Sequence, residues 1–154
     1  MVICMERTLS VAKELYNRYC EKFKGKMDEM KMHKLMYFVQ RESLMYSKEP
    51  LFEEDFYGWK FGPVLKSIRK EYKEGREFSN VCSDVSDVTK RYVNDVLDRY
   101  GNVSSWKLSS LSHNEFSWKE AREGLGASEN GDVKLSLSAM KVDAARELAS
   151  RRAV

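Results

Sequence analysis

The sequence has little proline and glycine and no long apolar run. Only 2 prolines and 8 glycines occur in 154 residues, so we expect long regular elements rather than a loop-rich chain. No stretch approaches the ~20 apolar residues that a membrane-spanning helix needs, and the sequence therefore predicts no membrane span. Glu6 and Arg7 come before any long apolar run, which favours a chain without a signal peptide.

Cysteine and histidine are also scarce, and they are scattered. Cys4, Cys20 and Cys82 form no CxxC pair, and neither His33 nor His113 lies near a cysteine. A structural zinc site needs four such ligands at short spacings, so we predict no metal site. Three separate cysteines are typical of a reducing compartment rather than of a secreted disulfide framework, which favours a cytoplasmic protein.

The common signatures of catalysis and cofactor binding are missing. Neither a GxSxG nucleophile elbow nor a GxGxxG or GxxxxGK[ST] phosphate loop is present. His113 lies in a short run with Ser112 and Glu115, but such close neighbours seldom meet in the geometry of a catalytic triad. We expect His113 to end a short helix and to hydrogen-bond the connecting backbone. The sequence thus predicts no enzyme and no cofactor, and the rival hypothesis is an enzyme with a perturbed His113 in a cleft.

What the chain does contain is typical of one folded domain. Apolar residues make up 42% and charged residues 33% of the sequence, which is a globular composition. A chain of 154 residues buries a real core without disulfides or metals. The net charge of +3 is lower than that of most dedicated nucleic-acid-binding proteins. We therefore interpret residues 1–154 as a single domain.

Apolar residues recur at helical spacing along most of the chain. The stripe at 9–23 predicts a first helix, with Thr8 as its cap and Gly25 beyond its end. Residues 35–46 are apolar on nearly every face, which predicts a central helix that starts at a cap on Asp28 and packs on several sides. Further helices are predicted near residues 63–74, 89–100, 104–112, 118–124 and 140–148. A capping box is expected at Ser117 in the helix near 118–124.

Residues 55–61 alternate between apolar and other side chains, which predicts a short strand. Tyr57, Trp59 and Phe61 share one face of this strand. This face could be a ligand platform or a partner surface. We interpret it as the face that packs on the core, because aromatic side chains of this size mostly stabilise a protein by burial.

The end of this strand is expected to lead directly into a helix. Gly62 would form the bend, and Pro63 fits the first helical position, where its missing N–H is not needed. A second strand at 132–137 is expected to pair with residues 54–61. The resulting fold class is mainly α, with six or seven helices and a two- or three-stranded antiparallel sheet.

The helix predicted at 63–74 carries a basic stripe, opposite its apolar face, at Lys66, Arg69, Lys70 and Lys73. A basic helix face can bind phosphates. We interpret the stripe as a solvated face, because the net charge is low and no second helix forms a recognition pair with it. The alternative function is a nucleic-acid-binding phage or prophage regulator that uses this face.

Several motifs occur in an order that resembles a known family. They are Lys34-Leu35-Met36-Tyr37-Phe38, Pro50-Leu51-Phe52, Gly58-Trp59-Lys60-Phe61-Gly62-Pro63-Val64, Leu111-Ser112-His113, Trp118 and Ala121-Arg122. Together they resemble the SocA-like, or Panacea, antitoxin domain, a phage-associated protein family, over about residues 9–145. The family usually has Leu-Gln before the Lys-Leu pair and tyrosine before Gly-Pro, where this chain has Met32-His33 and Phe61.

The resemblance implies a mostly helical fold and a non-enzymatic role. Members typically neutralise a toxin encoded beside them by binding it, and at least one branch delivers the toxin to an ATP-dependent protease. The chain is therefore expected to bind a cognate toxin protein and, as an adaptor, such a protease. The matching positions, structural or partner-facing, are Lys34, Leu35, Tyr37, Trp59, Gly62, Pro63, Val64, Ser112, His113 and Trp118.

Overall fold

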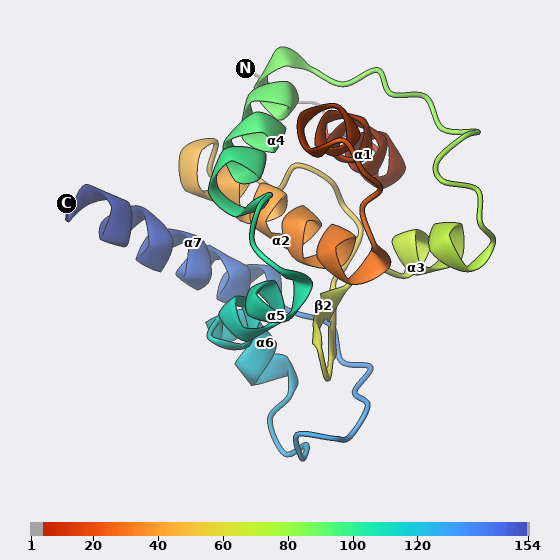
Figure 1. Cartoon of the computed structure of the whole chain (residues 1–154). Helices are drawn as coiled ribbons and strands as arrows, with labels where there is room; N and C mark the ends of the chain where they lie inside the picture. The colour runs from red at the N-terminus through yellow and green to blue at the C-terminus, as the bar shows by residue number, and fades with distance from the viewer. Residues whose placement is uncertain (1–4, 154) are drawn as a thin grey trace.

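The computed structural model describes residues 5–153 of the chain. This part contains seven helices and two short strands (Figure 1). In chain order they are α1 Thr8–Phe23, α2 Glu29–Tyr46, β1 Tyr57–Trp59, β2 Gly62–Val64, α3 Lys66–Lys73, α4 Asp87–Tyr100, α5 Ser105–His113, α6 Phe116–Ala121 and α7 Leu137–Arg152. The prediction of a mainly α fold with a small antiparallel sheet is confirmed.

Helix α2 lies at the centre of the fold. Every residue from Lys31 to Met45 is buried, because α1, α3, α4, α5, α7 and β2 all pack against this helix (Figure 1). This burial on all sides is what the apolar sequence predicts. The predicted cap is also confirmed, since the Asp28 carboxylate accepts a hydrogen bond from the Lys31 N–H at 2.8 Å.

Although α2 is buried on all sides, no helix in residues 5–153 is long and apolar enough to cross a membrane.

A buried polar cluster ties α2 to α6 and α7. The Tyr37 hydroxyl donates to the Asp143 carboxylate at 2.9 Å and lies 3.1 Å from the Ser117 hydroxyl. The same carboxylate accepts the backbone N–H groups of Phe116, at 2.6 Å, and Ser117, at 3.0 Å. The predicted capping box at Ser117 is therefore wrong, because a side chain from α7 satisfies the first N–H groups of α6.

The predicted cap of α1 is wrong, although the position of the helix is right. Thr8 is the first helical residue, and the cap position belongs to Arg7, whose side chain makes no capping bond. At the other end Gly25 lies just beyond the helix, as predicted, and the cap residue Lys24 adopts the left-handed conformation, with φ of 56°. Periodicity identifies the buried face of a helix, whereas its last turn depends on local contacts.

The Gly62-Pro63 junction is a hairpin rather than a bend into a helix. Strands β1 and β2 pair antiparallel, with Tyr57 opposite Val64. Gly62 has φ of 124°, a conformation that residues with a side chain rarely adopt. Pro63 lies within β2, so the next helix begins later than predicted, at Lys66.

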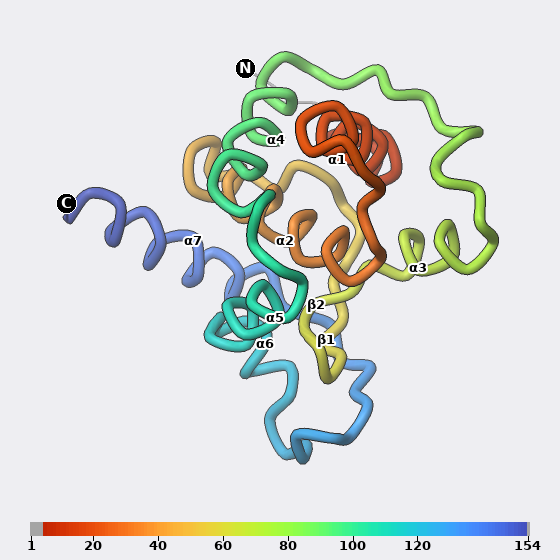
Figure 2. The backbone as a smooth tube through the Cα atoms, viewed as in Figure 1, coloured from red at the N-terminus to blue at the C-terminus, as the bar shows by residue number. Residues whose placement is uncertain are grey.

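The predicted strand at 132–137 is confirmed only in part. The Gly58 N–H donates to the Val133 carbonyl, and the Leu135 N–H donates to the Phe56 carbonyl, both at 2.9 Å. The segment therefore pairs with the hairpin, beside which it passes in Figure 2. It forms a single bridge rather than a strand, so the described sheet has two strands, both from the hairpin.

The aromatic row of the hairpin is not its core face. The row consists of Tyr57, Trp59 and Phe61. Phe61 is 44% exposed, and the other two rings are half-buried. The opposite face packs inward instead, with Phe56 buried and Gly58 so close to α6 that a Cβ would lie 2.9 Å from that of Ala121. The core interpretation of the row is therefore wrong, and its rings are left to line the surface.

Candidate functional site

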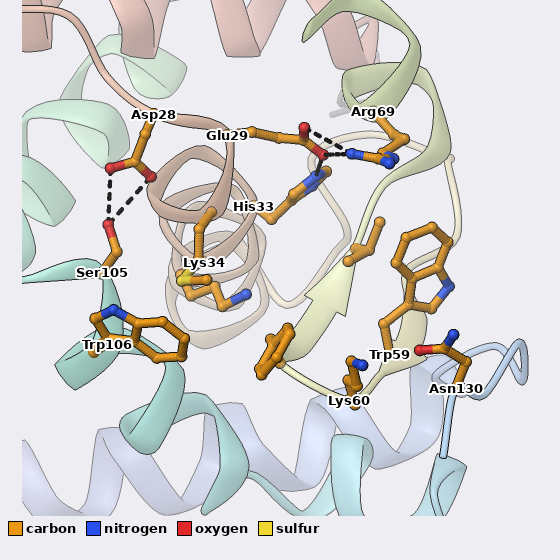
Figure 3. Close-up of a pocket in the computed structure, with 13 residues that line it drawn as sticks. Asp28, Glu29, His33, Lys34, Trp59, Lys60, Arg69, Ser105, Trp106 and Asn130 are labelled. Atoms are coloured by element: carbon orange, nitrogen blue, oxygen red, sulfur yellow. Dashed lines mark hydrogen bonds and ion pairs between the residues drawn. The ribbon is translucent and has the colours of Figure 1, made fainter. Parts of the chain in front are cut away.

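An open groove of about 700 Å³ lies beside the first turns of α2 (Figure 3). Its walls come from residues 28–34, from residues 59–64 of the hairpin, from Arg69 of α3 and from residues 105–106 of α5, with Asn130 at one edge. Segments far apart in sequence thus converge on one surface. Three of the family-motif positions line it, namely Lys34, Trp59 and Val64.

Two exposed aromatic rings form one rim of the groove. Phe61 is 44% exposed and Trp106 is 64% exposed. The rings meet edge to face, with centroids 5.7 Å apart and planes at 89°. The ammonium of Lys60 lies 5.2 Å from the centre of the Phe61 ring. Exposed aromatic side chains of this size are enriched at protein interfaces.

Lys34 lies at the floor of the groove, and its side chain is only 2% exposed. Figure 3 shows its amine pointing from α2 toward the hairpin. A Cβ on Gly62 would lie 3.1 Å from the Lys34 Nζ and 2.6 Å from the Ser112 hydroxyl, so only glycine fits here. Burial lowers the pKa of Lys34 to about 8, although Asp28 and Glu29 oppose this shift. Within residues 5–153 the ammonium has no hydrogen bond and no ion pair.

Both carboxylates of the groove already have partners. Asp28 accepts hydrogen bonds from the Ser105 hydroxyl at 3.0 and 3.1 Å. Glu29 pairs with Arg69 at 3.0 Å and with His33 at 3.0 Å, and these partners lower the pKa of Glu29 against the opposing effect of burial. Neither these carboxylates nor other side chains in residues 5–153 form a group of three that could hold a metal ion.

His33, which stands where the family usually has glutamine, is a buried structural residue. Its Nδ1 accepts the Leu65 N–H at 3.2 Å, and its Nε2 lies 3.0 Å from the Glu29 carboxylate. Because Nδ1 is an acceptor, the proton sits on Nε2 and is donated to Glu29. Burial lowers the pKa of His33, so the ring joins α2 to the start of α3 in its neutral form.

The Ser-His and Trp motif supports the hairpin from behind the groove. The rings of His113 and Trp118 stack, with centroids 4.0 Å apart, and the Trp118 Nε1–H donates to the Trp59 carbonyl at 2.8 Å. Partial burial lowers the pKa of His113, while hydrogen bonds to the backbone of Lys60 and Phe61 oppose this shift. The His113 ring lies within hydrogen-bond distance of the Ser109 hydroxyl, at 3.5 Å, and within residues 5–153 it does not make the predicted bond to the backbone of the α5–α6 connection.

The remaining motif positions are buried in the scaffold. Leu35, Tyr37 and Ser112 are fully buried, and Pro63 is buried in β2. The Ser112 hydroxyl donates to the carbonyl of Ser109 in its own helix at 2.8 Å. These residues hold the walls of the groove in place without lining it.

The predicted basic stripe lies on α3, exposed, at Lys66, Arg69, Lys70 and Lys73. Lys66 pairs with Asp132 at 3.1 Å and lies 4.0 Å from the centre of the Tyr57 ring. Arg69 pairs with Glu29. Half of the stripe therefore already has negative or aromatic partners, which favours its interpretation as a solvated face.

Trp106 is the groove residue that sequence reasoning missed. It belongs to none of the family motifs quoted above and lies on the short helix α5, next to Ser105. The available signal was a tryptophan on the polar face of a helix whose other face carries Leu108. A large aromatic residue on a solvent-facing position is a marker of an interaction surface.

Comparison with known proteins identifies the family of the chain. A family model described as antitoxin SocA-like, Panacea domain, matches residues 32–119, a span that runs from α2 into α6 and confirms the resemblance read from the motifs. No curated protein and no solved structure matches the chain. Because the family model covers more than half of the sequence, the chain belongs to the SocA-like, Panacea antitoxin family.

Proposed function

We propose that the protein is an antitoxin that binds and neutralises a cognate toxin protein without catalysing a reaction. Family membership supports an antitoxin-like role. The single observation that carries the binding role is the exposed pair Phe61 and Trp106 on the rim of an open groove. Aromatic anchors of this kind contribute most of the binding energy in many protein interfaces.

The groove is preformed, which suits tight binding. Hydrogen bonds connect Asp28 to Ser105 and Glu29 to Arg69, so α2 is tied to α5 on one side and to α3 on the other (Figure 3). The hairpin is held by the Trp118 side chain. A surface that is already ordered loses little conformational entropy when a partner binds.

Neutralisation by sequestration and delivery to an ATP-dependent protease are two forms of the same binding role. The two differ in the fate of the toxin. Sequestration leaves the amount of toxin unchanged, whereas delivery shortens its half-life in cells that carry the protease. Immunoblots of the toxin after translation is stopped, with and without the antitoxin, distinguish the two forms.

Co-expression with the product of the neighbouring gene tests the proposal. We expect the wild-type chain to restore growth and to co-purify with that product. The double variant Phe61→Ser, Trp106→Ser should lose both effects. The double variant Lys70→Ser, Lys73→Ser, which changes two exposed residues outside the groove, is the matched control and should keep both. If the wild-type chain neither rescues growth nor binds the neighbouring product, the proposal is wrong.

A further inference from the structure

Within residues 5–153 the ammonium of Lys34 forms no ion pair, although Asp28 and Glu29 in the same groove attract it from a distance. The side chain is almost fully buried, and Asp28 and Glu29 each bind other groups. A buried cation without a partner is strongly unfavourable. A perturbed ionisable group in a cleft marks a candidate binding site, and the amine of Lys34 points into the groove rather than into the core (Figure 3).

The apolar part of the groove lies next to this charge. Trp59, Phe61, Val64 and Trp106 line the same space as Lys34. Lys60, the other cation on this side, lies over the Phe61 ring. The groove therefore presents one apolar wall and a positive floor, and its complement is a group that is partly apolar and partly anionic.

We propose that the groove recognises an acidic side chain of the toxin that stands next to a large apolar one, with the carboxylate pairing with Lys34 and the apolar group packing between Phe61 and Trp106. This inference rests on the proposed function and names the chemistry of the partner. A charge-assisted hydrogen bond is about twice as strong as a neutral one, so this pair would dominate specificity.

A side-chain carboxylate fits this groove better than the carboxylate at a chain end. Chain-end carboxylates are usually captured by several backbone N–H groups. At the wall of this groove the Leu65 N–H is already bound to His33, and the Gly58 N–H of the hairpin is bound to the Val133 carbonyl. One ammonium on a long side chain suits one carboxylate on another side chain.

The groups around Lys34 allow its protonation to be followed without interference. The pKa values of the two histidines close to it, His33 and His113, are both lowered by burial, so both rings are neutral at pH 7 and above. The titratable and charged groups near the amine, from every element packed around it, are Asp28, Glu29 and His33 of α2, Lys60 of the hairpin turn, Arg69 of α3 and His113 of α5.

Three blocked dipeptides test the inference on the full-length protein. They are acetyl-Glu-Phe-amide, its neutral counterpart acetyl-Gln-Phe-amide, and acetyl-Gln-Phe with a free carboxyl end. Titrations followed by the indole N–H resonance of Trp106 should show the glutamate peptide binding about tenfold more tightly than the glutamine amide. Its affinity should fall about tenfold between pH 7 and pH 9, as Lys34 loses its proton.

Two variants separate recognition from folding. Lys34→Met keeps most of the length of the side chain and removes its charge, and it should bind the glutamate and glutamine peptides equally. Lys73→Met removes the same charge from an exposed position and should keep the preference. The inference is wrong if the two amide peptides bind equally to the wild type or if Lys34→Met keeps the preference. Stronger binding of the free-carboxyl peptide, or no shift with any peptide at about 10 mM, also refutes it.

The complex with the toxin separates this inference from the proposed function. If the neighbouring product is neutralised by Lys34→Met as well as by the wild type, the acidic contact is wrong and the antitoxin role stands. If that product is not bound at all, the antitoxin role is wrong. The peptide titrations alone then decide whether the groove recognises an acidic side chain next to an apolar one. If Lys34→Met loses toxin binding and Lys73→Met keeps it, the result supports both the antitoxin role and the acidic contact with Lys34.

Discussion

The two halves of α2 bury charge in opposite ways. In the second half, Arg41 pairs with Glu115 and lies 3.7 Å from Glu147, while Glu42 pairs with Arg151 at 2.5 Å. In the first half, Lys34 is as deeply buried but has no ion-pair partner among residues 5–153. The paired cluster faces helices of the same chain, and the unpaired amine faces an open groove. The comparison teaches that burial of a charge does not by itself indicate a binding site. A buried charge without an ion-pair partner is the feature that indicates one.

Removing Arg41 should produce the largest loss of stability. Arg41→Met leaves the buried Glu115 without its cation, whereas Glu147 keeps Arg151 at 2.9 Å, and breaking a buried pair in this way costs about 3–5 kcal/mol. Urea unfolding at pH 8 measures the loss. Burial raises the pKa of Glu115 to about 7, so the loss should shrink below pH 6, where that carboxyl is protonated. A loss below about 1 kcal/mol at pH 8 would show that the paired cluster is not a unit.

Replacing Lys34 should have the opposite effect on stability, because it should increase the free energy of unfolding. Its folded pKa of about 8 lies below the unfolded value of 10.5, so the unfolded state binds more protons between these pH values. Burial of the charge therefore destabilises the wild type at pH 7, and the free energy of unfolding should increase as the pH rises from 8 to 10.5. Lys34→Met should raise stability at pH 7 by up to about 3 kcal/mol.

Urea unfolding of Lys34→Met and of the exposed control Lys73→Met at pH 7 and pH 10 measures this effect. The gain should be smaller at pH 10 than at pH 7, because the wild-type amine is then neutral. A variant that is less stable than the wild type at pH 7 would contradict the view that the charge is kept for a partner.

The hairpin turn should tolerate no side chain at Gly62. Its φ of 124° and its approach to the Ser112 hydroxyl, 2.6 Å from a Cβ, predict that Gly62→Ala destabilises the protein by about 1–3 kcal/mol. Gly25→Ala is the matched control, since its nearest neighbour would lie at 3.9 Å and its backbone needs no positive φ. Thermal unfolding compares the two, and an equal effect at both positions would refute the claim that the turn shapes the groove.

The basic stripe of α3 should show the smallest effect. Lys70→Glu together with Lys73→Glu changes exposed side chains and should alter stability by about 0.5 kcal/mol or less. It should also leave toxin neutralisation unchanged. A gel-shift assay with the promoter region of the operon, at low salt, tests whether the stripe binds DNA. A shift that the wild type shows and this variant loses would restore the nucleic-acid-binding alternative.

Much of the scaffold could be predicted from the sequence, because helical periodicity is local. The all-round apolar pattern of 35–46 correctly identified the central helix, and Asp28 was correctly identified as its cap. The prediction that the aromatic row packs on the core was wrong for a physical reason. Alternation shows which residues share a face of a strand, but not which face turns inward, and here Gly58 lets the opposite face approach α6.

The candidate site was predictable only in part. Lys34 was named through its motif, but its missing counter-charge depends on Asp28 and Glu29 being bound elsewhere. Trp106 carried no motif, and its role as a rim residue follows from its contact with Phe61 of the hairpin. Neither property can be read from neighbours in sequence.

By itself, then, the sequence determined the helices, the buried core helix and the family, because periodicity, caps and motif order are encoded within short segments. Only the tertiary structure decided which buried charges have partners and which face of the hairpin is free. Those outcomes depend on side chains far apart in the chain, such as Glu42 and Arg151, which lie 109 residues apart. Their geometry exists only once the segments have packed around α2.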